Sequence, residues 1–213
     1  MKRLRFPLLF LLSGFALGLL CSVSLMHFFR PAAGIPDVSV SQDTIPSTTQ
    51  LLQSAAQAAQ ALHDKDYEAL SQLVHPDRGV TFTPYSTVDP KTDLTLTAQQ
   101  IRELEQDTTR YTWGYEDGRG DPIQMTIPQY LERYVFDADY TQAPKVGVDE
   151  IQISGNALEN LPEAYPDCRF VDLCYPSRDP ESDGLDWCSL KLVFSPGPSQ
   201  WQLVGVVHGE WTI

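Results

Sequence analysis

The chain has 213 residues, of which 42% are apolar, and it carries 15 basic against 28 acidic side chains. All four basic residues of the first thirty precede any acid, so residues 31–213 hold 11 basic and 28 acidic groups, a net charge of about −17. Such an acidic body repels phosphate backbones, which argues against nucleic-acid binding. The apolar and aromatic content excludes a collagen-like or wholly disordered chain, and the length allows one domain of ordinary size.

Residues 7–29 contain no charged side chain apart from the titratable His27. As a helix they span roughly 34 Å, enough to cross a hydrocarbon core of about 30 Å. Three cations precede this run and one follows it, which places the N-terminus in the cytoplasm. The run is longer than the apolar stretch of a signal peptide, and no good cleavage site follows it. We therefore predict a single-pass signal anchor over residues 1–30 in the cell membrane, with the rest of the chain extracytoplasmic. Cleavage of the leader, which would make the protein secreted, and lipidation at Cys21 are the alternatives.

Residues 31–48 contain three prolines, no aromatic side chain and almost no charge. Such a segment buries too little apolar surface to offset the entropy lost on ordering, so we predict a flexible stalk. The domain then occupies residues 49–213.

Three Ser or Thr residues are each followed three positions later by Gln, the pattern of a helix capping box. The pairs are Ser47/Gln50, Thr97/Gln100 and Thr126/Gln129. After the first box, apolar residues recur at helical spacing as far as about His63. Asp64 or Asp66 then begins a second helix, which ends at His75-Pro76 because the residue before proline is pushed out of helical geometry. The third box begins a short helix with proline in its first turn.

In the second half of the chain the apolar period changes from 3.6 to 2. Apolar residues alternate from Cys188 to Phe194, and a turn at 195–200 leads into the apolar run 201–213, which predicts an antiparallel hairpin with one buried face. Further strands are expected near residues 80–84, 111–115, 147–154 and 168–175. Helices early and strands late predict an α+β domain with helices on one face of an antiparallel sheet.

Four segments resemble a group of uncharacterised bacterial secreted or membrane-anchored proteins. They are HPDRGVTFTPY (75–85), WGYEDGRGDPI (113–123), YLERYVFDADY (130–140) and LKLVFS with WQLVGVVHGEWTI (190–213). The order helix, helix, strand, helix and long antiparallel strands resembles the cone-shaped fold named after nuclear transport factor 2 (NTF2-like), over roughly residues 50–213. This resemblance implies helices packed on a curved sheet. Because the fold houses enzymes, ligand binders and assembly modules alike, it does not choose a function.

Cys168, Cys174 and Cys188 lie outside the apolar leader, an odd number for an oxidising compartment. A hairpin of strands 168–175 and 187–195 places Cys174 nearly opposite Cys188. We therefore expect a disulfide between them, which closes a loop of about 15 residues and contributes roughly 3 kcal/mol in the chain-entropy model. Pairing through Cys168, or three free thiols, are the alternatives. No evident base lies beside a cysteine, and neither a C-x-x-C motif nor a nearby His pair indicates zinc.

Two loops resemble ligand motifs. Residues 179–184 place oxygen ligands at positions 1, 3 and 5 of a calcium-type loop, but position 12 is Leu190 where a Glu is required. We interpret this segment as a solvated acidic loop. Residues 119–121 read Arg-Gly-Asp, and the neighbouring glycines indicate a tight turn that sets strand register. We predict neither a metal nor an adhesion site here.

Five residues are pocket candidates: His75, Trp113, Asp117, His208 and Glu210. Histidine and carboxylate side chains are natural acid–base groups, and a tryptophan can line a ligand pocket. No phosphate-binding glycine loop, Gly-x-Ser-x-Gly elbow or His-Glu-x-x-His helix is present, so we assign no catalytic residue and no cofactor.

The sequence favours a non-enzymatic extracytoplasmic domain that binds a small ligand or another envelope protein. The rival is a small-molecule acid–base enzyme with its site in the cone. It requires a pocket of a few hundred Å³ with convergent polar groups of shifted pKa. Tryptophans and tyrosines that fill the cone would exclude catalysis there. A third alternative is a homodimer formed through the sheet face, which would require an exposed apolar patch.

Overall fold

The computed structural model describes residues 45–212, and these residues belong to one compact unit. The predicted membrane segment and most of the predicted stalk lie outside the described residues. Within residues 45–212, no helix is both long and apolar enough to cross a membrane.

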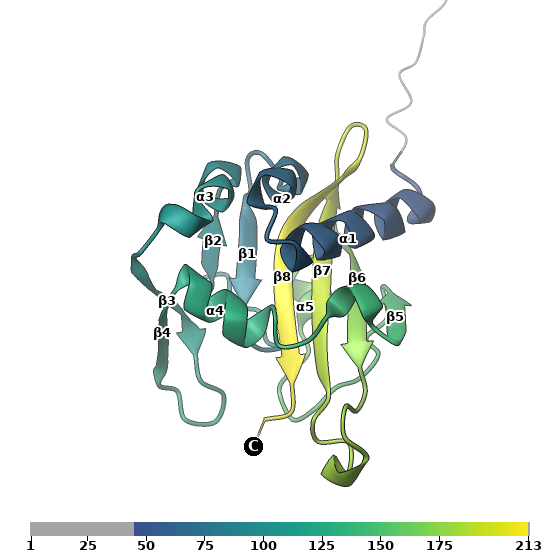
Figure 1. The fold of residues 1–213 in the computed structure, drawn as a ribbon. Coiled ribbons are helices and arrows are strands. Elements are labelled where there is room, and N and C mark those ends of the chain that lie inside the picture. Colours follow the sequence, from purple (N-terminus) through teal and green to yellow (C-terminus); the bar gives the residue numbers. More distant parts are fainter. Residues whose placement is uncertain (1–44, 213) are drawn as a thin grey trace, which may run out of the picture. The chain divides into compact units, whose positions relative to one another are not determined.

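The domain is α+β, as predicted, with a mostly antiparallel sheet and helices packed on it (Figure 1). Six strands form the main sheet in the order β2-β1-β8-β7-β6-β5: β1 (Val80–Thr83), β2 (Leu94–Leu96), β5 (Lys145–Val148), β6 (Arg169–Tyr175), β7 (Cys188–Pro196) and β8 (Trp201–Glu210). A two-stranded sheet pairs β3 (Arg110–Tyr115) with β4 (Pro122–Thr126). Strand β1 runs parallel to β8, so the prediction of a wholly antiparallel sheet is wrong at this pair. The two strands lie far apart in the sequence, so no hairpin turn fixes their relative direction.

The helices are α1 (Thr48–His63), α2 (Tyr67–Leu73), α3 (Ala98–Arg102), α4 (Ile127–Tyr134) and α5 (Leu161–Ala164). Short 3₁₀ turns follow at η1 (Leu104–Gln106), η2 (Tyr140–Gln142) and η3 (Pro180–Ser182).

The predicted capping boxes begin α1, α3 and α4. At Ser47 and Thr97 the hydroxyl accepts the backbone N–H three residues on, and the Gln side chain accepts the cap residue's N–H. Asp66, rather than Asp64, begins α2, because its Oδ1 accepts the Ala69 N–H at 2.9 Å. The capping pattern therefore located three helix starts from local sequence alone.

Apolar layers cover both faces of the sheet. The larger layer lies between the sheet and the helices α1, α2 and α4. On the opposite face, residues 149–168, which we call the strap and which include α5, cover a smaller apolar cluster: Val88, Leu161, Tyr165, Phe170, Val193, Val204 and Val207. Strand β7 is consequently buried on both faces, and even Ser189 and Lys191 are fully buried. The prediction of a hairpin with one buried face is therefore wrong, because the strap covers the face expected to meet solvent.

The strand expected at 147–154 ends early, at Val148. Asp149 adopts a left-handed conformation with φ of 53°, and its carboxylate accepts the Phe170 N–H and pairs with Arg169. The chain therefore turns away from the sheet at this point and begins the strap.

The expected disulfide is absent, since the three cysteines of the described residues are free thiols. Strand register pairs Cys174 with Ser189 and Cys188 with Tyr175. Because successive side chains on a strand point to opposite faces, this offset of one residue places the two thiols on opposite faces of the sheet. Burial raises the pKa of Cys174 to about 11 and that of Cys188 to about 12, so both thiols are unreactive near neutral pH.

Candidate functional site

An acidic cleft of about 240 Å³ lies beside the ends of β1 and β3. It is lined by Pro84, Tyr85, Thr87, Asp89, Thr92, Asp93, Tyr115, Glu116 and Asp117. Four of these side chains are carboxylates and two are tyrosines, and none of the described residues that line the cleft is basic. Its volume is slightly below the range of about 300–1,000 Å³ that is typical of small-molecule sites.

Strand β3 forms one wall of the cleft because it bends at Gly114. The pairing of β3 with β4 is irregular between Thr112 and Tyr115, and Gly114 has a φ of 135°. A Cβ atom at Gly114 would lie 3.3 Å from Pro84 and 3.4 Å from the Asp93 Oδ1 atom. A glycine therefore lets the strand approach both residues closely.

Asp93 is the carboxylate of the cleft with the most perturbed acidity. Its Oδ2 atom accepts hydrogen bonds from the Thr83 hydroxyl at 2.8 Å and the Asp89 N–H at 2.9 Å. Burial raises the pKa of Asp93 to about 6, although these hydrogen bonds lower it. Asp93 therefore changes charge close to physiological pH.

Asp117 and Tyr115 form the exposed rim. Asp117 accepts a hydrogen bond from the Thr212 hydroxyl at 2.6 Å, and Tyr115 is 50% exposed. Gly118 and Gly120 adopt left-handed conformations in the loop after β3, which confirms the predicted tight turn around the Arg-Gly-Asp tripeptide. Arg119 in this turn pairs with Glu116 and Asp121.

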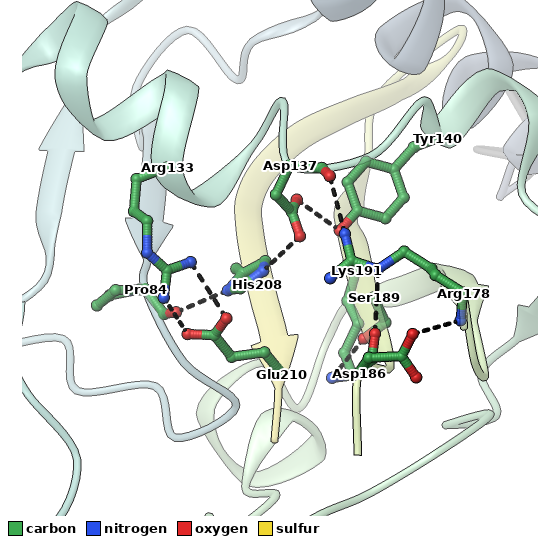
Figure 2. A network of polar contacts seen from close by, with 10 residues as sticks. All are labelled: Pro84, Arg133, Asp137, Tyr140, Arg178, Asp186, Ser189, Lys191, His208 and Glu210. Carbon is green, nitrogen blue, oxygen red and sulfur yellow. Dashed lines mark hydrogen bonds and ion pairs between the residues drawn. The ribbon is translucent and has the colours of Figure 1, made fainter. Parts of the chain in front are cut away.

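His208 supports the cleft from behind, and it is only 1% exposed. Figure 2 shows its ring between Pro84 and Asp137: Nδ1 lies 3.0 Å from the Pro84 carbonyl oxygen and Nε2 lies 3.3 Å from Asp137 Oδ2. Burial alone would raise the pKa of Asp137, but its hydrogen bond to His208 and the charge of that ring lower it. We interpret this buried pair as a support that fixes the cleft wall at Pro84.

Glu210 forms a second support next to His208 (Figure 2). Its two carboxylate oxygens accept hydrogen bonds from Arg133 at 2.6 and 3.1 Å. The guanidinium also lies 4.6 Å from the centre of the Tyr134 ring, which packs edge-on against Tyr85 of the cleft. Glu210 thus neutralises a cation close to the cleft, so that the carboxylates of the cleft keep their negative potential.

Trp113 belongs to the core rather than to the cleft. Its side chain is fully buried, stacks on Tyr130 at 3.8 Å between ring centres and donates Nε1–H to the Met125 carbonyl. Phe82 packs edge-on against both rings. Aromatic side chains therefore fill the space between α4 and the sheet.

His75 is not among the residues that line the cleft. Its Nδ1 atom accepts the backbone N–H groups of Asp77 and Arg78, both at 3.2 Å. The structure thus gathers Asp117, His208 and Glu210 around one end of the sheet and leaves His75 outside that group.

Comparison with protein-family models and with curated proteins finds no significant match. The cleft is therefore interpreted from its own chemistry.

The calcium-like loop holds its carboxylates on backbone groups. Asp186 accepts the N–H groups of Arg178 and Asp179, and Asp179 accepts the N–H of Glu181. Among residues 45–212, no three His, Cys, Asp or Glu side chains are arranged to hold a metal ion.

A second hollow, of about 290 Å³, lies between α1 and the edge of the sheet at β5 and β6. Its walls are mainly apolar, and Leu52 and Val146 on its rim are 40% and 51% exposed. This groove lies at the edge of the sheet beside α1, and not on the sheet face through which the predicted homodimer would form.

Sequence reasoning missed Tyr85, Asp89 and Asp93, which carry most of the cleft. One signal was available, because two aspartates lie four residues apart in the polar segment between two strands. That spacing alone does not distinguish a cleft from an ordinary solvated loop.

Proposed function

We propose that this protein is a non-enzymatic binding module, displayed outside the membrane, whose acidic cleft takes a small positively charged ligand. The observation that supports this proposal is the one-sided charge of the cleft, where Asp89, Asp93, Glu116 and Asp117 surround a small cavity. Tyr85 and Tyr115 add aromatic faces, which attract cations through their ring quadrupoles.

The charge of the whole chain favours the same class of ligand. The formal net charge is −13 at pH 7. A negatively charged surface with a concave acidic site concentrates cations and raises their association rate, and salt weakens both effects. Diamines, polyamines and quaternary ammonium compounds have the required charge and size.

The position of the cleft agrees with display on a stalk. At one end of β8, Trp201 Nε1 donates to the Ser47 carbonyl oxygen at the start of α1, where the chain enters the domain. The cleft lies near the other end of β8, beyond Glu210, and ten strand residues span about 30 Å. Figure 1 shows the start of α1 and the end of β8 at opposite ends of the sheet. A stalk attached at the start of α1 would therefore join the domain at the end of β8 that lies away from the cleft. The order of helices and strands also supports the NTF2-like assignment, which we keep as part of the proposal.

Isothermal titration of the full-length protein with spermidine and, separately, choline tests the proposal. We expect saturable binding of at least one probe at pH 7.5, weakened by 0.5 M NaCl. Asp93→Asn should weaken this binding at least fivefold, because it removes a half-buried negative charge from the cleft. Asp167→Asn, an exposed carboxylate of the strap outside the cleft, is the matched control and should leave binding unchanged. No saturable heat with either probe up to 10 mM, or equal loss in both variants, would contradict the proposal.

The acid–base enzyme stays a second candidate because of Asp93, whose pKa of about 6 suits a general base. Mass spectrometry of a bound compound after prolonged incubation separates the two functions, since a binding module returns its ligand unchanged. The aromatic filling behind the cleft supports the binding module, because Phe82, Trp113 and Tyr130 occupy the space between α4 and the sheet.

A further inference from the structure

A buried polar cluster lies beneath the strap, on the face of the sheet opposite the helices α1, α2 and α4. Lys191 of β7 and Asp172 of β6 are direct partners across the two strands, and both side chains are fully buried. The Lys191 Nζ atom lies 3.2 Å from Glu159 Oε1 and 3.3 Å from the Ser189 hydroxyl, which Figure 2 shows beside it. The Asp172 Oδ2 atom accepts the Gln152 N–H at 2.8 Å. Because Glu159 and Gln152 belong to the strap, the cluster fastens the strap to the sheet at two points.

The neighbouring strands leave room for this cluster by carrying glycine. Gly209 of β8 pairs with Ser189, and a Cβ atom there would lie 3.0 Å from Lys191 Nζ and 2.9 Å from the Ser189 hydroxyl. Gly147 of β5 pairs with Asp172, and a Cβ atom there would lie 2.2 Å from the Glu150 carbonyl oxygen of the strap. Both positions therefore exclude any larger side chain without a local rearrangement.

The cluster is short of one positive charge. One ammonium group faces two carboxylates, and Glu159 Oε2 and Asp172 Oδ1 are buried without a hydrogen-bond partner among the described residues. An unpaired buried acceptor of this kind is destabilising. One proton held by one of the two carboxylates would bring the net charge of the cluster to zero.

The surroundings favour this protonated state. Burial raises the pKa of Asp172, the charge of Lys191 opposes that shift, and the charge of Glu159 adds to it. Burial likewise raises the pKa of Cys174, which lies on the same strand face, to about 11, so this thiol stays neutral. Lys145 of β5, which pairs with Cys174 in the sheet, is exposed. Asp172 is thus the carboxylate of this face whose pKa lies above its ordinary value.

We propose that Asp172, Glu159 and Lys191 form a proton-dependent latch, which holds the strap on the sheet while protonated and releases it when the proton is lost. Loss of the proton leaves a net negative charge beneath the strap, and that charge is relieved when the strap opens to water.

The latch also reaches the cleft wall. Asn160 of the strap exchanges two hydrogen bonds with the Val88 backbone, at 2.8 and 2.9 Å. The Thr87 hydroxyl, which lines the cleft, donates to the Leu158 carbonyl at 2.7 Å. Weaker ligand binding at higher pH would therefore follow from release of the strap. This consequence rests on the proposed function, whereas the latch itself does not.

Hydrogen–deuterium exchange of the full-length protein tests the latch without any ligand. Exchange is followed in peptides from the strap and from α1 between pH 4.5 and 8.5, in the unaltered protein and in Asp172→Asn. Comparison at each pH cancels the intrinsic effect of pH on exchange. At pH 8.5 we expect the strap of the unaltered protein to exchange about tenfold faster than that of Asp172→Asn, the ratio for a group whose pKa differs by one unit between closed and open states. At pH 4.5, which is closer to the ordinary pKa of an aspartate, the difference should be smaller.

Two further variants keep the test decisive if Asp172→Asn folds poorly. Glu159→Gln removes the repulsion between the carboxylates and should move the onset of strap exchange to a different pH. Glu163→Gln, an exposed carboxylate on α5, should behave like the unaltered protein. A strap whose relative exchange does not depend on pH, or an α1 that changes in parallel with the strap, would overturn the proposal.

Discussion

Replacing Asp93 with asparagine tests whether burial governs the acidity of the cleft. An asparagine oxygen can still accept the hydrogen bonds from the Thr83 hydroxyl and the Asp89 N–H, so the substitution changes mainly the charge. The pKa of Asp93 rises from 3.8 to about 6 on folding, which corresponds to about 3 kcal/mol at neutral pH. Because the side chain is only half-buried, solvent screens part of this cost. We expect Asp93→Asn to raise the free energy of unfolding by about 1–2 kcal/mol at pH 7.5, or roughly 3–6 °C in Tm for a domain of this size.

The gain has a defined dependence on pH. For an acid with a raised folded-state pKa, stability is fully present below the unfolded value and is lost as the pH rises through the folded value. Asp93→Asn should therefore match the unaltered protein below about pH 4, exceed it progressively between pH 4 and 6, and keep a constant advantage above pH 7.

Urea unfolding, followed by tryptophan fluorescence at pH 4.0, 5.0, 6.0 and 7.5, measures this difference. Trp113 and Trp201 are both buried and should report the loss of the core. Asp167→Asn is the control, since it removes an exposed carboxylate away from the cleft. An equal gain at pH 4.0 and 7.5, or none at pH 7.5, would refute the argument from burial.

Three other substitutions test the fold and the supports of the cleft. Trp113→Ala should lower the free energy of unfolding by about 3–5 kcal/mol, because it removes a fully buried ring stacked on Tyr130, whereas Trp113→Phe should cost less; urea midpoints compare the two. Gly209→Ala should lower the free energy of unfolding by about 1–3 kcal/mol, since the new methyl group would press on Ser189 and Lys191. Gly120→Ala is the comparison: its Cβ has open space, so only the left-handed backbone conformation opposes the substitution. Glu210→Gln should lower the free energy of unfolding by about 1 kcal/mol, because Arg133 then loses its paired carboxylate. A Tm that is unchanged at low salt would contradict a stabilising role of this ion pair.

Much of the fold follows from local sequence. Helix starts at Ser47, Thr97 and Thr126 depend on contacts three residues apart, and these contacts form as the capping pattern predicts. The β7–β8 hairpin likewise follows from alternation around one turn. In both cases the interacting residues are close in the chain, so their spacing carries the information.

The prediction of a disulfide between Cys174 and Cys188 was wrong because it depended on strand register. The alternation that predicts β6 and β7 does not fix their register, and a shift of one residue reverses the face of every side chain. The structure aligns Cys174 with Ser189, which separates the thiols by the thickness of the sheet. Register depends on the packing of both faces, and no local sequence pattern indicates that the strap covers the second face.

The buried cluster and the part of the cleft around Asp93 escaped prediction because their surroundings come from distant segments. Lys191 alternates with apolar residues and therefore resembles the exposed position of an ordinary half-buried strand, yet Glu159, 32 residues earlier, closes over it. Asp93 resembles a loop aspartate until Gly114 and Tyr115, from another hairpin, approach it. A charge placed in a strand that is otherwise apolar is therefore informative only once the element covering that face is known. In this chain that element is the strap, which also connects the buried cluster to the wall of the cleft. If the latch and the cleft act together, Asp172→Asn and Asp93→Asn should couple energetically even though Asp172 lies in β6 and Asp93 lies between β1 and β2. A double-mutant cycle in urea with an interaction term below about 0.3 kcal/mol would show that the two sites are independent.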